Sequence, residues 1–405
     1  MSLLPKLPVI IVGAGIVGLA LAQALKKEGI PFQIYERDQH LAARPSGWGI
    51  SVSRAALETL LASALPSALS SIQVDPHQRT DLNSSSLFLN LETGETAFKI
   101  PPGARWRVSR GKLRELLARG IDVKWGKSIS DFQPTNHGIS VSFSDGTKIE
   151  GSVLAAADGG RSKARRLLLG DDQGSINPLP VSCLAFNLRL TSEKAAMLLA
   201  IDPLLFQGNH PGTGTYVFFA LLSTPERNGS SETDSLHFEV QLEVSWLLNG
   251  PEDEVPKNNA ERLAKIKALA TAGTGFITAL RETIEDIPDD ATVLHIRVAD
   301  WPTVPWNGLD GRVTLLGDAA HPMTQYRGGA ATHGFTDATN LTEQLRLWHQ
   351  GSKNRQEALA DYEAEMIQRG HEAVLLSRQA CLDAHDMRHL TADSSMVNRD
   401  DDHAV

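Results

Sequence analysis

Residues 9–18 read VIIVGAGIVG, and this stretch predicts the fold. The β-branched run before the first glycine is typical of a parallel strand that is buried on both faces. Gly13 permits a tight turn, Gly15 lets the backbone approach a pyrophosphate, and Gly18 lets the next helix pack against the strand. We expect that helix over about residues 16–28, with its partly positive N-terminus directed at the phosphates. The stretch therefore predicts a strand–turn–helix unit that binds a dinucleotide.

An acidic residue at the end of the next predicted strand supports this interpretation. Residues 32–37 read FQIYER, and Glu36 lies eighteen positions after Gly18. A carboxylate at this spacing can accept hydrogen bonds from ribose hydroxyls, and Arg37 follows it directly. Two alternatives stay open, a glycine-rich turn in another kind of α/β protein and a signal or anchor segment over residues 7–25. The second is disfavoured because glycines interrupt the segment and it has no basic leader or cleavage pattern.

The composition excludes several other classes of protein. With 405 residues, the chain can bury a large core and is expected to form two domains. The net charge of −9 argues against nucleic acid as a partner, and residues 161–166 form only a short basic cluster. Cys183 and Cys381 are too few for a disulfide framework, so we expect the reducing cytoplasm. No other stretch is apolar enough to predict a membrane span.

A second glycine-centred stretch lies far along the chain, where residues 313–322 read VTLLGDAAHP. A chain that returns to its dinucleotide with Gly317, Asp318 and Pro322 resembles the FAD-dependent aromatic hydroxylases. These are group A, single-component flavoprotein monooxygenases, here of the type found in fungal specialised metabolism. Residues 154–165, LAAADGGRSKAR, are similar to the middle Asp-Gly motif of that family. The alternative for this third stretch is an ordinary Asp-Gly turn that closes a strand.

The resemblance implies which residues hold FAD. Arg44 matches a loop arginine that pairs with the pyrophosphate. Arg110 matches an arginine that opens a Leu-spaced helix, although an amphipathic helix with a solvent-facing arginine fits equally well. Asp318 would bind ribityl or ribose hydroxyls, Pro322 would lie beside the flavin ring, and Asp337 should matter less. The expected FAD contacts are Gly13, Gly15, Gly18, Glu36, Arg37, Arg44, Gly49, Arg110, Asp158, Gly317, Asp318, Pro322, Gly328, Gly329, Ala330 and Ala331.

After Pro322 the sequence departs from the family pattern. Gln325 replaces a second proline, Ala330 the second glycine of Gly-x-Gly, and Thr332 an asparagine. The helix that begins here would face the flavin pyrimidine edge, where its dipole stabilises the reduced flavin. Ala330 would cost about 1 kcal/mol if its position required a positive φ, while Thr332 could still donate through its hydroxyl. We expect FAD binding to persist and the outcome at the flavin to change.

The resemblance implies an α/β fold with a Rossmann-like FAD-binding domain, an inserted, mostly antiparallel β-sheet substrate domain and a C-terminal helix. Residues 237–244 alternate so strictly between polar and apolar that one face of their strand is expected to be exposed. The polar, acidic residues 390–405 are expected to form a disordered tail. The discontinuous FAD-binding domain is expected over residues 1–72, 105–175 and 295–385, and the substrate domain over residues 73–104 and 176–294.

The implied function is a monooxygenase with noncovalent FAD, reduced by NADPH or NADH. Reduced flavin would bind O2 as a C4a-hydroperoxide and would hydroxylate or epoxidise a small hydrophobic substrate. No catalytic side chain is assigned, and the candidates to line the substrate cavity are Trp48, Tyr216, His237, Gln325, Tyr326 and Arg327.

Three alternatives to this function stay open, and no metal site is expected. One alternative is an oxidase or Baeyer–Villiger enzyme, another a non-redox cyclase, and the third a non-catalytic flavin-binding protein. His385 and His389 are spaced for one helical face, but no further ligand accompanies them, so a solvated face is expected.

Overall fold

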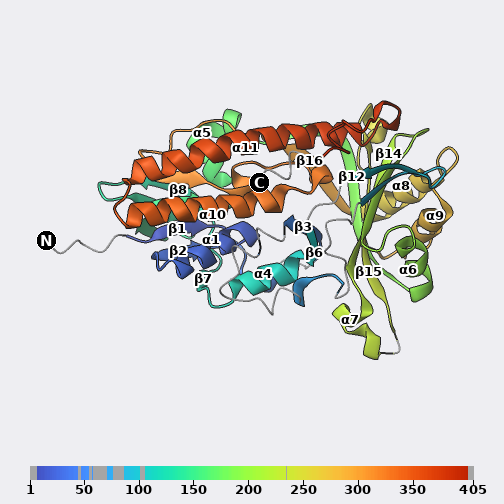
Figure 1. Ribbon diagram of the computed structural model, residues 1–405, viewed down its shortest axis with the longest axis horizontal. Helices are drawn as coiled ribbons and strands as arrows, with labels where there is room; N and C mark the ends of the chain where they lie inside the picture. Colours follow the sequence, from blue (N-terminus) through green and yellow to red (C-terminus); the bar gives the residue numbers. More distant parts are fainter. Residues whose placement is uncertain are drawn as a thin grey trace.

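The computed structural model describes residues 7–43, 47–53, 57, 71–75, 86–100, 105–233 and 235–399. Two sheets lie at opposite ends of the molecule, and the long helix α11 (Arg355–Asp383) runs from one toward the other beside α10 (Ala330–His349) (Figure 1). The predicted fold class is confirmed, because a parallel Rossmann-like sheet is combined with an inserted, mostly antiparallel sheet and a C-terminal helix.

The sheet that carries the first glycine motif has five parallel strands. β1 is fully buried, as its β-branched residues predict, and α1 (Ile16–Lys27) follows it at the expected position. α1 packs against α10 and against α4 (Arg110–Ala118). The spatial order is β17 (Val313–Leu315), β11 (Val153–Ala156), β1 (Val9–Val12), β2 (Phe32–Tyr35) and β7 (Val123–Lys124).

A small antiparallel sheet packs on this unit, with the Tyr35 and Phe143 ring centroids 4.8 Å apart. Its strands are β8 (Ile129–Pro134), β9 (Ile139–Phe143) and β10 (Lys148–Gly151). Elements of the described chain outside the sheets include α5 (Lys163–Gly174), α7 (Pro225–Asn228) and the 3-10 turns η1 (Leu41–Ala43), η2 (Ser230–Glu232), η3 (Pro251–Asp253), η4 (Gly317–Ala319), η5 (Gln325–Arg327) and η6 (Met387–His389).

The inserted sheet has seven strands, and all neighbours are antiparallel except β13 and β4. One face packs through apolar side chains on α6 (Ser192–Leu199), α8 (Asn259–Thr271) and α9 (Thr278–Glu285). Because β16 pairs with β12, the domain boundary predicted at residue 295 lies inside this sheet. The spatial order is β16 (Leu294–Asp300), β12 (Asn177–Leu190), β15 (Phe238–Leu247), β14 (Thr215–Ser223), β13 (Leu205–His210), β4 (Ser86–Asn90) and β5 (Thr96–Ile100).

The opposite face of β15 corrects the expectation of an exposed polar row. Gln241, Glu243 and Ser245 are only 3 %, 8 % and 0 % exposed. The amide of Gly49 donates to Gln241, in the strand pair β3 (Gly49–Ser53) and β6 (Arg105–Ser109), and His385 contacts Ser245 from the end of α11. The expectation is wrong because the alternation separates two buried faces, one apolar and one polar.

The C-terminal segment corrects a second expectation. Met396 is 0 % and Val397 4 % exposed, and both pack into a cluster with Tyr216 and Tyr326. The guanidinium of Arg327 donates to the carbonyls of Ser395 at 2.6 Å and Asn398 at 2.9 Å. A disordered tail is therefore wrong for residues 390–399, because these buried contacts fix a segment whose composition is polar. Residues 400–405 lie outside the described part of the chain.

Candidate functional site

The first glycine motif forms an open turn between β1 and α1. Gly13 has a φ of 106°, and a Cβ atom there would collide with the carbonyl of Ala157. A Cβ atom on Gly18 would collide with the carbonyl of Gly13, so helix and turn approach closely only with glycine. Gly15 is the N-cap residue of α1, and no atom lies within 4 Å of the position that a Cβ atom would take there. The turn therefore presents open helix N–H groups, the arrangement that binds phosphate.

Glu36 lies at the predicted place at the end of β2 and is 4 % exposed. Its carboxylate accepts hydrogen bonds from the amides of Ala14 at 2.6 Å and Asp38 at 3.0 Å. Arg37 is exposed beside it, and Arg44 lies outside the described residues.

Arg114, which is not among the contacts expected from the sequence, braces this turn. Its guanidinium donates to the carbonyls of Ala14 at 2.8 Å and Leu41 at 3.1 Å, and it pairs with Asp38 at 3.4 Å. Arg114 lies one helical turn after Arg110 on the Leu-spaced helix, and this spacing is the signal that could have identified it. The expected contact Arg110 is half-buried, and its backbone amide donates to Trp48.

The middle motif starts a helix. Asp158 accepts hydrogen bonds from the Ser162 hydroxyl at 2.5 Å and from the amides of Lys163 at 2.7 Å and Ala164 at 3.1 Å. These bonds cap the N-terminus of α5 and direct the carboxylate toward that helix. The contact between Asp158 and FAD stays a prediction.

Arg165 connects the middle motif with the third motif. It is 1 % exposed and donates to the carbonyls of Gly160 at 2.6 Å and Ala319 at 2.9 Å. Its guanidinium also lies over the ring of Trp301, 4.8 Å from the centroid.

A buried charged cluster holds the third motif. Asp337 is 0 % exposed and accepts hydrogen bonds from the amide of Gly317 at 2.7 Å and from His321 at 2.6 Å. Its other oxygen pairs with Arg369 at 2.7 Å. Burial alone would raise the pKa of Asp337, but the charges and hydrogen bonds of His321 and Arg369 hold it below its usual range. That Asp337 matters less than Asp318 for FAD binding stays a prediction, and its contacts show that it holds this loop in place.

The three motifs converge at the carboxyl ends of neighbouring strands. Val12 is paired with Ala156, and Ala156 with Leu315, so the three loops begin side by side. A Cβ atom on Gly334 would lie within 2.5 Å of the Val17 side chain, showing how closely α10 approaches the first motif.

The described residues fit FAD. The turn at Gly15 is open, and Gly159 also faces open space. The carboxylate of Asp318 is exposed and makes no hydrogen bond within the described chain, so it is available to ligand hydroxyls. A phosphate cradle and an available acid at adjoining strand ends are what a dinucleotide requires.

The loop that departs from the family pattern is accommodated without backbone strain. Ala330 is the first residue of α10, and the only non-glycine residues with positive φ in the described chain are Leu309 and Asp310. The expected conformational cost at Ala330 therefore does not arise. The hydroxyl oxygen of Thr332 accepts a hydrogen bond from the amide of Ser53 at 3.3 Å, which ties α10 to β3. Gly328, with a φ of 65°, precedes Gly329 at the start of the helix.

The cavity candidates do not all lie together. Tyr216 and Tyr326 are buried, with their ring centroids 5.1 Å apart, and donate to Gln207 and Ser245. Arg327 binds the C-terminal segment instead. His237 lies at the start of β15, where its ring contacts the Ser235 carbonyl at 2.8 Å. Trp48 is half-buried, and Gln325 is the exposed member of the set.

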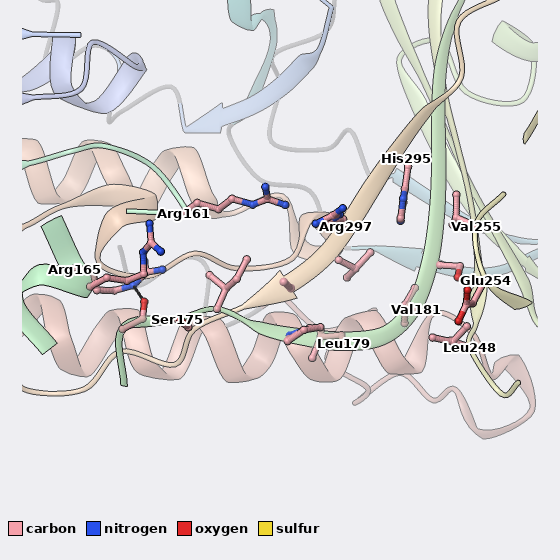
Figure 2. A pocket seen from close by; sticks show the side chains of 17 residues that line it. Arg161, Arg165, Ser175, Leu179, Val181, Leu248, Glu254, Val255, His295 and Arg297 are labelled. Carbon is pink, nitrogen blue, oxygen red and sulfur yellow. Dashed lines mark hydrogen bonds between the residues drawn. The ribbon is translucent and has the colours of Figure 1, made fainter. Parts of the chain in front are cut away.

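A cavity of about 630 Å³ lies along β12 and β16 beside α5 (Figure 2). Arg161, within the middle motif, and Arg297 on β16 extend toward one another across it, and neither has a side-chain partner in the described chain. Partial burial and the charges of Arg262 and Arg297 lower the pKa of His295 at its edge. The lining contains four arginines, Arg166 among them, and one acidic residue, Glu254, so the cavity is electropositive; Leu179, Val181 and Val255 also line it.

Two further features of the described chain concern metals and membranes. No group of three or more His, Cys, Asp or Glu side chains is arranged there to hold a metal ion. The solvated face expected for His385 and His389 is wrong for His385, which is 3 % exposed and contacts Ser245, whereas His389 is exposed. None of the helices described is both long and apolar enough to cross a bilayer.

Comparison with known proteins identifies the family. Residues 6–200 match the family described as FAD binding domain. The chain is 46% identical over 347 residues to the FAD-dependent monooxygenase dbaB of Emericella nidulans, covering 84% of this chain and 87% of that protein. It is 40% identical over 412 residues to a protein of Arthroderma benhamiae described as an FAD-dependent monooxygenase, covering 96% and 95%. The fold also matches 2,6-dihydroxypyridine-3-hydroxylase from Arthrobacter nicotinovorans, with a TM-score of 0.76, 19% identity and coverage of 97% and 96%. The chain thus belongs to the FAD-dependent monooxygenases and uses FAD as its cofactor.

Proposed function

We propose that this monooxygenase uses NAD(P)H and dioxygen to hydroxylate or epoxidise a small, largely hydrophobic aromatic molecule. The observation that carries this proposal is the convergence of the three motifs beside the buried polar face of the seven-stranded sheet. When bound, FAD accepts a hydride from the nicotinamide and, once reduced, activates dioxygen.

We propose that the chain's own residues hold FAD in three places. The open turn at Gly13 and Gly15 binds the pyrophosphate, Glu36 the adenosine ribose and Asp318 the ribityl chain. The N-terminus of α10, at Gly329 and Ala330, then faces the flavin ring and stabilises negative charge on it. The buried Asp337 cluster fixes the Gly317 turn, so that this arrangement is preorganised.

We also propose that the electropositive cavity receives the nicotinamide cofactor. Arg161 belongs to the middle motif, and Arg165 connects that motif with the backbone of Asp318 and Ala319. Phosphate groups held by Arg161 and Arg297 would therefore lie next to the FAD loops. Hydride transfer needs such proximity.

The substrate is proposed to bind between the loop at Gln325 and the inner face of the seven-stranded sheet. Phe218 is half-buried on that face, with the guanidinium of Arg107 5.6 Å from its ring centroid. The buried row on β15 limits access of water from behind, which protects the reduced cofactor from unproductive turnover.

The cell compartment and pathway are part of the proposal. Cys183 and Cys381 are free, buried thiols, which suits the reducing cytoplasm. The relatives named above from Emericella and Arthroderma are fungal, and we propose a role in specialised metabolism.

The test is a set of three measurements on purified protein. Acid precipitation should release FAD, and anaerobic mixing with NADPH or NADH should bleach its absorbance. Aerobic turnover in isotopically labelled dioxygen, with fractions of a fungal metabolite extract as the substrate source, should give a product carrying one labelled oxygen. Reduction that yields only peroxide with every fraction would favour the oxidase alternative, and absence of reduction would favour a flavin-binding protein.

A further inference from the structure

The inner face of β15 carries a row of polar side chains that needs a functional explanation. Gln241, Glu243 and Ser245 alternate with Val240, Leu242 and other apolar residues that face α8 and α9. Burying polar side chains costs stability unless every group is hydrogen-bonded. Ser245 belongs to a chain of contacts with Tyr326 and His385, whereas Gln241 and Glu243 face the strand pair β3–β6 and the loop at Gln325.

Gln241 positions Glu243 beside a buried arginine. The Gln241 carbonyl accepts hydrogen bonds from the amide of Gly49 at 3.2 Å and from Arg107 at 3.3 Å. Its amide nitrogen then donates to Glu243 at 2.6 Å. Burial lowers the pKa of Arg107 to about 10, while the charge of Glu243 opposes this shift. Burial raises the pKa of Glu243, and its hydrogen bonds with Gln241 and Gln325 and the charge of Arg107 oppose this shift. One oxygen of Glu243 is already engaged by Gln241.

The second oxygen of Glu243 fixes the side chain of Gln325. The Gln325 amide nitrogen donates to it at 3.4 Å. The same nitrogen also contacts the Cys183 sulfur at 3.8 Å, so both contacts of the Gln325 amide are made by its nitrogen. The carbonyl oxygen Oε1 of Gln325 is therefore directed away from Glu243, and no group in the described chain donates to it.

Gln325 also lies at open space next to the cofactor loop. Its side chain is exposed, although its neighbours Glu243, Tyr326 and Cys183 are buried. In the sequence, Gln325 lies between the cofactor-loop residue Pro322 and Gly328. No atom lies within 4 Å of the position that a Cβ atom would take at Gly328. An oriented acceptor at this place can contact a molecule bound at the flavin.

We propose that Gln325 is a specificity-determining residue whose Oε1 accepts a hydrogen bond from a hydroxyl group on the aromatic substrate. Glu243 is its positioning residue, since it acts only by orienting the amide. The preferred substrate is then a hydroxylated arene. A methyl ether cannot donate this bond, and a carboxylate would place a second negative charge near Glu243. This inference rests on the proposed function, because it takes the space beside Gln325 to be the substrate site.

The test compares two probes that differ only in the hydrogen-bond donor, 1-naphthol and 1-methoxynaphthalene. Each is titrated into the oxidised holoenzyme, and binding is followed through the change in the flavin spectrum. The wild type should bind 1-naphthol about tenfold more tightly than the ether, the scale of one hydrogen bond to an oriented acceptor. Gln325→Leu should reduce this ratio to about one, by weakening 1-naphthol binding and leaving the ether unchanged.

Glu243→Gln tests orientation separately, because it keeps the size of the side chain. Its amide can donate as well as accept, so the Gln325 amide loses its fixed orientation, and the ratio should fall to roughly threefold. Gln368→Leu is the matched control, since Gln368 also donates to a glutamate at 3.4 Å but lies exposed on α11. It should keep the wild-type ratio.

The proposed function and the inference about Gln325 are contradicted by different results. Protein that lacks FAD, or whose flavin NAD(P)H does not reduce, contradicts the proposed function. Protein with reducible FAD contradicts the inference if wild type shows no preference for 1-naphthol, or if Gln325→Leu and Glu243→Gln retain it. Should Gln325→Leu lose FAD, Glu243→Gln alone decides the outcome.

Discussion

Asp318 and Asp337 lie in or near the same motif, but their environments assign them different tasks. Asp318 is exposed and makes no side-chain hydrogen bond in the described chain, whereas Asp337 is buried with three partners. The carboxylate of Asp318 is therefore available to a ligand, whereas that of Asp337 is already engaged by contacts within the protein.

Asp318→Ala should weaken FAD binding and leave stability unchanged. We expect a loss of roughly 1.5–3 kcal/mol in FAD affinity, the scale for a hydrogen bond to a charged group. The free energy of unfolding of the FAD-free protein should change by less than about 0.5 kcal/mol, because the side chain is exposed. Fluorescence titration and urea unfolding measure the two quantities. Unaltered FAD affinity would mean that another acid binds the ribityl chain.

Asp337→Ala should act mainly on stability. Removing the Asp337 carboxylate takes away the buried partner of His321 and leaves Arg369 with Glu365 alone, and we expect roughly 3–5 kcal/mol of destabilisation of the FAD-free protein. Asp337→Asn should recover part of this loss, because its carbonyl can still accept the hydrogen bond from Gly317. Urea unfolding of both variants checks the prediction, and a stability equal to that of Asp318→Ala would contradict it.

At the scale of elements, local signals predicted more than contacts between distant residues did. The strand, turn and helix of residues 9–27 were predictable because a β-branched run and three glycines each limit the backbone locally. The burial of the polar side chains on β15 was not predictable. A strand shows the same alternation of polar and apolar residues whether its polar face contacts water or other parts of the protein. Its partners come from far along the chain, as in the contact between Gly49 and Gln241.

The residues of the candidate site show the same difference between local sequence signals and contacts with distant residues. The motif glycines, Glu36 and Asp318 could be placed because a short sequence pattern carries the chemistry of each. Arg114 and Asp337 belong to helices, and each contacts a turn that lies far from it in the sequence, at Ala14 and at Gly317. The segment 390–399 was misjudged because composition alone does not report the burial of Met396 and Val397.

His385, just after the end of α11, makes the free energy of unfolding depend on pH. Burial lowers the pKa of His385 to about 4, while its contact with the Cys381 carbonyl opposes the shift. As the pH falls below about 6.5, the unfolded chain takes up a proton that the folded chain excludes, so stability is lost until about pH 4. The loss reaches up to about 3 kcal/mol.

His385→Asn should therefore make the free energy of unfolding decline less steeply between about pH 6.5 and 4.5. Urea unfolding at a series of pH values measures this slope. His389→Asn is the control, because that side chain is 80% exposed and should leave the slope nearly unchanged. Parallel curves for wild type and His385→Asn would show that His385 titrates normally in the folded protein.

At the scale of the whole molecule, the electropositive cavity lies where the two sheet systems meet. Arg161 comes from the loop after the parallel strand β11, and Arg297 from the edge strand of the seven-stranded sheet. Both guanidinium groups are exposed and extend into the same cavity, so an anion between them can contact both. The arrangement of the two sheets therefore supports an anionic ligand that bridges them, as NAD(P)H would.

Arg161→Ala and Arg297→Ala should each raise the Kd for NAD(P)H roughly tenfold or more, the scale of one charge-assisted hydrogen bond. FAD content should not change, because neither side chain belongs to the expected FAD contacts. The Kd is obtained from the dependence of the anaerobic flavin reduction rate on NADPH and on NADH. Arg189→Ala is the matched control, since Arg189 is an exposed arginine of β12 paired with Glu239. An effect limited to NADPH would assign the cavity to its additional phosphate. If both variants kept the wild-type Kd for both cofactors, the nicotinamide donor would have to enter by another route.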